Sequence, residues 1–366
     1  MQTKTRPSDN FYKLLKIIRL SSSLVGIDVI DENYKFNYVV GFVLMAIAWN
    51  FMISIYTICK DVKTDWTVLL DVFSPISCAT QGVVKIISLL LYPKLYRELA
   101  MDLVEIYKKY QALGSKYETK LLEWNQSMKN ILIIGGLGER HLIIMCQMPY
   151  VDVNTDHGYF ITIGYNILCV FVAAFGLYGA DLYVFLFLTH SIFFYDIFAL
   201  KVGDLHEVLR ENNKDKRIEA LVNDIAGWHQ YYLEFNDKCN LIFFWTITSH
   251  ILCTTLGILS TLLIIMLKYW PGAYPYIFVC FVWLYMYSIL GTRVEICNDQ
   301  FCDGIYDINW YDLDVSAQKT VSLMLMESQV PRIITIAGIE PLSVNTALKI
   351  TRSIYSLVMM VMQFNE

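Results

Sequence analysis

The chain has 366 residues, a formal net charge of −5, and a hydrophobic fraction of 56%. A soluble domain usually contains about 45–50% apolar residues, and a run of about 18 apolar residues is long enough to cross a membrane. Several runs in this chain exceed that length. The composition therefore excludes an ordinary soluble or disordered chain and predicts an all-α polytopic membrane protein, for which we expect no nucleic-acid partner.

Seven transmembrane helices are predicted, at residues 37–59, 67–92, 128–148, 159–194, 241–267, 273–290 and 342–364. The fourth run is too long for one bilayer and too short for two helices with a turn between them. At about 1.5 Å per residue it is expected to be one helix that projects well beyond the membrane. The first 36 residues are polar and basic, so no cleavable signal peptide is expected.

The lysines and arginines alternate in number between the loops. The N-terminal segment, the second loop and the fourth loop carry six each, whereas the first, third and fifth carry two, none and one. Because cytoplasmic loops are enriched in these residues, the N-terminus is predicted to be cytoplasmic and the C-terminus extracellular. This orientation is inverted relative to G-protein-coupled receptors. It also places the sequon at Asn125 on the inside, where it cannot be glycosylated.

The two long cytoplasmic loops, at residues 93–127 and 196–240, have apolar residues at three- and four-residue spacing. They are expected to be helical extensions of the membrane helices that pack together. Residues 1–294 are predicted to hold the N-terminus, the first six membrane helices and an outer ligand pocket. Residues 295–366 are predicted to form a cytoplasmic anchor segment and the last helix, with Pro331 and a turn at 338–341 between them.

Among the charged residues inside the apolar runs are Lys85 in the second and Asp181 in the fourth. An unpaired charge in a membrane is costly, so one hypothesis is that these two side chains contact each other. The alternative is that Lys85 extends its ammonium group to the inner interface.

The outer halves of the membrane helices combine aromatic walls with a few hydroxyl groups and one amide. Such a lining suits a small, mostly apolar ligand, since no acidic or basic residue clearly faces it. The alternative is that these aromatic residues form interfacial belts or ordinary core packing. The candidate ligand-binding residues are Phe73, Ser77, Ile143, Cys146, Gln147, Tyr150, Phe171, Phe175, Tyr276 and Val279.

Motifs for catalysis do not occur in the sequence. It has no His-Glu-x-x-His, no Gly-x-Ser-x-Gly, no phosphate-binding glycine loop and no cysteine pair with zinc spacing. We therefore expect neither an enzyme, nor a catalytic residue, nor a metal site, nor a cofactor.

The C-terminal third carries a series of short motifs in a fixed order. They are Tyr306-Asp307-Ile308-Asn309-Trp310-Tyr311, Ser328-Gln329-Val330-Pro331, Ala337-Gly338, Pro341-Leu342-Ser343 and Ser353-Ile354-Tyr355-Ser356. This series resembles the insect odorant receptor family. The resemblance implies a cation channel, gated by a small volatile odorant, of four subunits around one pore in the plasma membrane of a sensory neuron dendrite. Odorant-tuned members form hetero-oligomers with a common coreceptor. The fourth loop of this chain is short, as in a tuned subunit, whereas the coreceptor has an enlarged loop there.

The resemblance also assigns roles on the last helix, which would line the pore. The gate of the family falls about three positions after the tyrosine, which corresponds to Val358. Thr351, Ile354 and Val361 complete the predicted pore and gate residues, and a ring of such side chains closes a pore by dewetting. The expected partners are a small volatile odorant, the coreceptor and membrane lipid. The alternatives are a homomeric channel of gustatory type and, in a different class, a membrane transporter.

Overall fold

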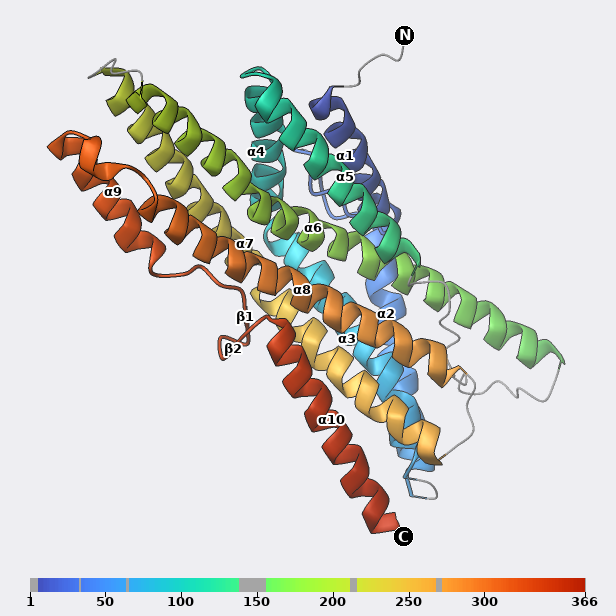
Figure 1. The fold of residues 1–366 in the computed structure, drawn as a ribbon. Coiled ribbons are helices and arrows are strands. Elements are labelled where there is room, and N and C mark those ends of the chain that lie inside the picture. Colours follow the sequence, from blue (N-terminus) through green and yellow to red (C-terminus); the bar gives the residue numbers. More distant parts are fainter. Residues whose placement is uncertain are drawn as a thin grey trace.

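The computed structural model describes residues 6–32, 34–63, 66–137, 156–210, 216–267 and 272–365. These residues form long helices and one short hairpin (Figure 1). The helices are α1 (Pro7–Leu24), α2 (Tyr38–Asp61), α3 (Val68–Leu91), α4 (Pro93–Gln111), α5 (Ser115–Leu137), α6 (Asp156–Arg210), α7 (Lys216–Leu267), α8 (Ala273–Tyr306), η1 (Trp310–Asp312), α9 (Val315–Ser328) and α10 (Val344–Asn365). The strands are β1 (Thr335–Ile336) and β2 (Glu340–Pro341).

Within the described residues, five helices are long and apolar enough to cross a membrane: α2, α3, α6, α7 and α8. This supports the polytopic helical class. Most of the predicted third span, 128–148, lies outside the described residues. Helix α10 is not among the five, which agrees with the polar residues that interrupt it. The number of seven spans and the orientation therefore stay predictions, although the two chain ends lie at opposite ends of the bundle (Figure 1).

The predicted long fourth helix is confirmed, because α6 runs without interruption for 55 residues. At about 1.5 Å per residue it is about 80 Å long, far more than the about 30 Å hydrocarbon layer. The predicted helical loops are confirmed as well. Helices α4 and α5 and the first half of α7 pack around α6 beyond the apolar spans, beside α9 (Figure 1). The predicted domain boundary at 294/295 falls inside α8.

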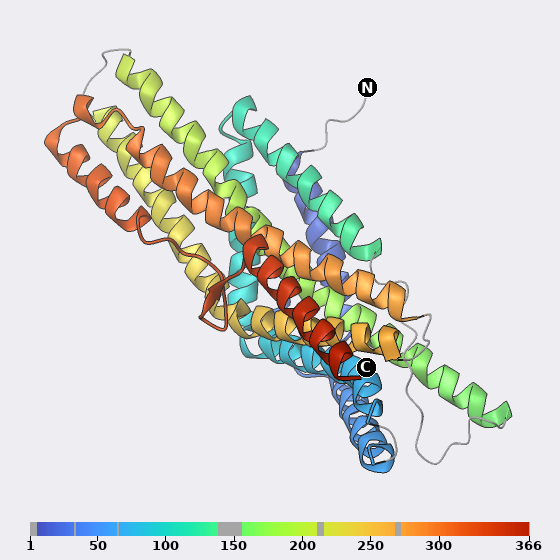
Figure 2. The ribbon, with the colours of Figure 1, turned by 60° about the horizontal axis from the view of Figure 1, so that its bottom comes forward.

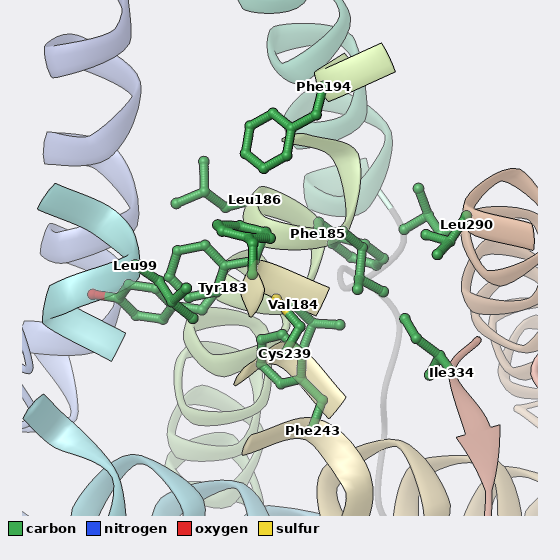
Figure 3. Close-up of a cluster of buried hydrophobic side chains, with 14 of the residues drawn as sticks. Leu99, Tyr183, Val184, Phe185, Leu186, Phe194, Cys239, Phe243, Leu290 and Ile334 are labelled. Atoms are coloured by element: carbon green, nitrogen blue, oxygen red, sulfur yellow. The ribbon is translucent and has the colours of Figure 1, made fainter. Parts of the chain in front are cut away.

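The middle of α6 is enclosed on all sides. Its residues from Leu182 to Leu188 are buried, which is the behaviour of a helix that is apolar around its whole circumference. Helices α1, α3, α5, α7 and α8 all contact it. Figure 3 shows this core, in which α6 side chains meet Leu99 of α4, Phe243 of α7, Leu290 of α8 and Ile334 before β1.

The helical extensions are joined by polar contacts as well as by packing. The Trp124 indole donates to Asp196 at 2.9 Å, and the Tyr117 hydroxyl donates to Asp204 at 2.9 Å. A hydrogen bond to Glu207 raises the pKa of Lys116, which keeps this lysine charged beside α6. The Asn125 side chain is buried and donates to the Pro7 carbonyl at 2.8 Å. The asparagine of this sequon is therefore packed inside the folded chain.

The predicted turn at 338–341 is confirmed as the tip of the hairpin. Ala337 and Gly338 adopt positive φ angles of 54° and 71°, a conformation that glycine accepts without strain. The hairpin is attached to α7, because the Ala337 amide donates to the Thr248 hydroxyl at 2.9 Å and the Asn240 amide donates to the Ile333 carbonyl at 3.2 Å. The start of α10 is therefore fixed by α7.

A buried ionic contact joins α3 to α6. The Lys85 ammonium lies 2.6 Å from the Asp181 carboxylate, and these side chains are only 1% and 3% exposed. The predicted pair is thus confirmed, and Lys85 does not extend to the interface. The sequence did not predict its two neighbours. The Tyr287 hydroxyl of α8 donates to Asp181, and the His250 ring of α7 lies 3.4 Å from the Lys85 nitrogen.

These four residues form one network, hereafter the Lys85 network: Lys85, Asp181, His250 and Tyr287. The His250 and Tyr287 rings stack with centroids 4.2 Å apart, which closes the group between α7 and α8. Because a lysine ammonium only donates hydrogen bonds, His250 accepts through Nδ1. The network satisfies two buried charges and holds four membrane helices at one level.

Replacing one member of the ion pair should destabilise the protein much more than replacing both. Lys85→Met or Asp181→Leu leaves the other charged group unmatched in an apolar site, which typically costs about 3–5 kcal/mol. The double variant K85M/D181L should recover most of that loss. Thermal unfolding in detergent, together with surface expression, measures the effect.

The exposed pair Lys120–Glu123 on α5, at 3.1 Å, offers a matched control. Lys120→Met should change stability by less than about 1 kcal/mol, because solvent screens such pairs. If the losses of K85M and D181L simply add in the double variant, the two side chains do not stabilise each other and the account given above is wrong.

Candidate functional site

The predicted ligand-binding residues fall into two groups. Four of them, Ile143, Cys146, Gln147 and Tyr150, lie outside the described residues. Phe171 and Phe175 lie on α6, in a stretch whose side chains also fall outside the described part. Their place in a pocket stays a prediction.

The other four lie on α3 and α8. Ser77 and Tyr276 are buried, Val279 is half-buried, and Phe73 is 41% exposed. The Tyr276 hydroxyl interacts with the thiols of Cys78 on α3 and Cys280 on α8. Tyr276 therefore connects α8 to α3 one residue from Ser77, so the structure brings two of the predicted residues to the same region.

A glycine on α7 makes room for this contact. A Cβ atom at Gly257 would lie 2.9 Å from the Tyr276 hydroxyl oxygen, which is closer than side chains approach. The absence of a side chain at Gly257 thus lets the tyrosine pass across α7 toward α3. The sequence offers one signal for it, an isolated glycine within a helical pattern, which often marks close packing.

The Lys85 network lies farther along α3, toward the C-terminal end of this helix. Cys78 and Lys85 are seven residues apart on α3, which places them on the same face two turns apart. The lysine charge there is matched by Asp181. The surroundings of Tyr276 and Ser77 therefore consist of rings, thiols and hydroxyl groups, with no unmatched charge among the described residues. Such surroundings favour a neutral ligand with one hydrogen-bonding group.

Helix α8 also contacts α10, through the side of α8 that faces away from the Lys85 network. The Tyr285 hydroxyl lies 3.3 Å from the Thr351 hydroxyl, and the Thr292 hydroxyl accepts from the Val344 amide at 2.9 Å. Tyr285 is two residues before Tyr287 of the network. Helix α8 thus carries Tyr276, the network residue Tyr287 and the contacts that hold α10. Figure 2 shows the start of α10 beside α8.

The closest approach between α8 and the segment leading into α10 occurs at Gly291. A Cβ atom there would lie 1.9 Å from the Leu342 carbonyl oxygen, so no other residue fits without moving the backbone. The backbone of residue 342 therefore rests directly on α8. The Ser343 hydroxyl then accepts from the Thr346 amide and caps α10.

The predicted pore residues share one face of α10. Ile354 and Val358 are 3% and 4% exposed and pack against the same chain, while Thr351 and Val361 are half-buried. The exposed face of α10 presents Tyr355, Met359 and Met360, of which Tyr355 is 65% exposed. In a single chain the predicted gate is thus buried, and among the described residues α10 contacts α7 and α8.

Comparison with known proteins gives matches over nearly the whole chain. A curated relative, odorant receptor 83c of Drosophila melanogaster, is 26% identical over 398 aligned residues that include 99% of each chain. The solved structure of the insect olfactory receptor OR5 from Machilis hrabei has a TM-score of 0.77 at 14% identity and covers 98% of this chain and 99% of that one. The same receptor in complex with eugenol gives a TM-score of 0.76 at 13% identity, with the same coverage.

The structural matches show the fold, which is that of a multi-pass helical membrane protein. The family model described as 7tm Odorant receptor matches residues 65–355, most of the chain, and includes the helices that carry Lys85, Asp181, His250 and Tyr287. The chain therefore belongs to the 7tm Odorant receptor family, whose members are odorant-gated channels and not enzymes.

Proposed function

We propose that this chain is an odorant-tuned subunit that forms a heterotetramer with the odorant receptor coreceptor in the plasma membrane of a sensory neuron dendrite. A small, mostly apolar volatile binds in the outer pocket between α3, α5, α6 and α8, and the assembly opens a cation pore lined by α10. The observation that carries this proposal is that α8 holds Tyr276 in the predicted pocket and also holds the start of α10. A ligand that moves α8 therefore acts on α10 directly.

The ligand class follows from the groups around Tyr276. Its ring offers an apolar face, its hydroxyl and that of Ser77 offer hydrogen bonds, and the charges of Lys85 on α3 and Asp181 on α6 neutralise each other. Burial of a neutral volatile supplies the affinity, and one hydroxyl contact sets its orientation. A phenol, an indole or an alcohol meets these requirements. The eugenol complex of the structurally similar receptor agrees with this class.

The proposed opening starts with a shift of α8 relative to α3. The Lys85 network holds α8 at Tyr287, so a ligand near Tyr276 tilts the outer part of α8 about a fixed point. Tyr285 lies just before that point and Gly291 and Thr292 lie beyond it, and these residues pass the change to α10. The ligand favours the open arrangement only to the extent that it binds this arrangement more tightly.

For the gate we propose the stripe Thr351, Ile354, Val358 and Val361, with Val358 at the constriction. Its present contacts with the same chain require that α10 turns when four subunits assemble or when the pore opens. The exposed stripe, with Tyr355 and Met359, is the second candidate, because it faces away from the chain.

Whole-cell current under a panel of volatiles should appear only when this chain is expressed together with the coreceptor. The coreceptor alone provides the background response. A ligand-dependent current from this chain alone would instead indicate a homomeric channel of the gustatory type. Substrate flux without gated current would indicate a transporter. With surface expression verified, the absence of any ligand-dependent current across a broad panel would contradict the proposal.

Replacing Tyr276 should weaken the response to every ligand found in that panel. Tyr276→Ala removes a buried ring and a hydroxyl group, so the half-maximal concentration should rise by about tenfold or more. Tyr274→Ala is the matched control, because this neighbouring tyrosine on α8 is exposed. Dose–response currents of the two variants measure the difference. Equal shifts in both would place the ligand elsewhere.

Cysteine substitution distinguishes the two stripes of α10. With Val358→Cys, a charged thiol reagent should block the current, and about tenfold faster when odorant is present, because opening exposes this position. Tyr355→Cys represents the other stripe, and the unsubstituted chain measures the background from native cysteines. Block through Tyr355→Cys and never through Val358→Cys would show that the exposed stripe lines the pore.

A further inference from the structure

Helix α1 has two faces of different character. Its buried face, with Phe11, Leu14 and Ile18, packs against α4, α5 and α6. The opposite face exposes apolar side chains beside cations, among them Ile17, Leu20, Lys13 and Lys16. An exposed helix face that alternates apolar and basic residues is typical of a helix at a membrane surface.

A hollow of about 570 Å³ lies along this face, between α1, Ile30 and Met101 of α4. Its walls are largely apolar, with Leu15, Leu20, Ile30 and Met101 among them. Its rim carries three cations and none of the lining residues is acidic. The full lining is Tyr12, Lys13, Leu15, Lys16, Arg19, Leu20, Ser23, Ile30 and Met101.

Two of the three cations are available to a ligand. Arg19 is bound to Asp28 at 2.7 Å. In the described part of the chain, neither Lys13 nor Lys16 forms an ion pair, and both are exposed. A fourth cation, Lys108 of α4, lies 5.7 Å from the centre of the Tyr12 ring at the same rim. The hollow thus joins an apolar wall to excess positive charge.

The depth of this hollow follows from the contacts of Ser22. Its backbone nitrogen would lie 3.1 Å from a Cβ atom at Gly179, and its hydroxyl is 3.4 Å from that of Tyr183. These α6 residues flank Asp181, so the end of α1 lies at the level of the Lys85 network, inside the apolar layer. At about 1.5 Å per residue, Lys16 and Lys13 lie about 9 and 14 Å farther out, at the depth of lipid headgroups.

We propose that this groove, defined by the residues that line the hollow, binds an anionic phospholipid of the cytoplasmic leaflet. Lys13 and Lys16 hold the phosphate and the acidic headgroup, and an acyl chain covers Leu15, Leu20, Ile30 and Met101. The inference rests on the proposed orientation, with α1 on the cytoplasmic side, where anionic lipids concentrate. The bound lipid would hold α1 against α6 next to Asp181.

The test measures lipid binding to the purified full-length chain in neutral detergent, with phosphatidylserine and phosphatidylcholine that carry a fluorophore on the acyl chain. Phosphatidylserine should bind about tenfold more tightly than phosphatidylcholine. The variant K13Q/K16Q should remove this preference and leave phosphatidylcholine binding unchanged. Met101→Trp fills the hollow and should weaken both lipids. K60Q/K63Q is the matched control, because it removes two exposed lysines at the other end of α2.

Four outcomes would overturn the proposal. The first is equal affinity for the two lipids, and the second is an equal loss of phosphatidylserine affinity in K13Q/K16Q and K60Q/K63Q. The third is competition by free glycerophosphoserine as strong as that by the lipid. The fourth is release of the lipid when the coreceptor binds. The third would indicate a soluble anion and the fourth a subunit contact. Binding in detergent depends on neither conduction nor orientation, so a failure here is distinct from a failure of the proposed function. A glycan acceptor placed in the N-terminal segment tests the orientation separately.

Discussion

The arrangement of the membrane helices depends on the ion pair between Lys85 and Asp181. Two opposite charges in an apolar layer are tolerable only when they contact each other and when hydrogen bonds satisfy what remains. Tyr287 supplies one such bond and His250 another, so four helices must keep one register for the charges to remain matched. A sliding motion of any one helix would expose a charge to lipid. This constraint leaves tilting about the network as the low-cost motion.

The network also explains why one helix can serve two regions. Tyr287 fixes α8 at one level, while Tyr276 lies about three turns toward the other end and reaches across Gly257 to α3. Tyr285 contacts Thr351 of α10, and Gly291 contacts Leu342, which leads into that helix. Apolar packing alone would allow α8 to slide in lipid, since a lipid chain is as apolar as leucine. The polar contacts give α8 a defined pivot.

The structural features that depend on a local sequence pattern could be predicted from the sequence. The length of its apolar run anticipated that α6 would be one helix projecting beyond the membrane, and the cost of isolated charges led to Lys85 and Asp181 as partners. The sequence could not identify His250 and Tyr287, because periodicity does not say which faces of distant helices meet. The face of α10 that would line the proposed pore could not be derived from periodicity either. Resemblance assigns Val358 to the gate, and in one chain this residue packs inward.

The attachment of α10 has a mechanical consequence. The residues leading into the helix are fixed at Leu342 and Ser343, whose backbone rests on Gly291, while its last residues extend beyond those contacts (Figure 1). A helix of 22 residues is about 33 Å long. It therefore acts as a lever with its fulcrum at Gly291, and a rotation of about 5° at this base moves the far end by about 3 Å. Small rearrangements around α8 are thereby amplified along α10.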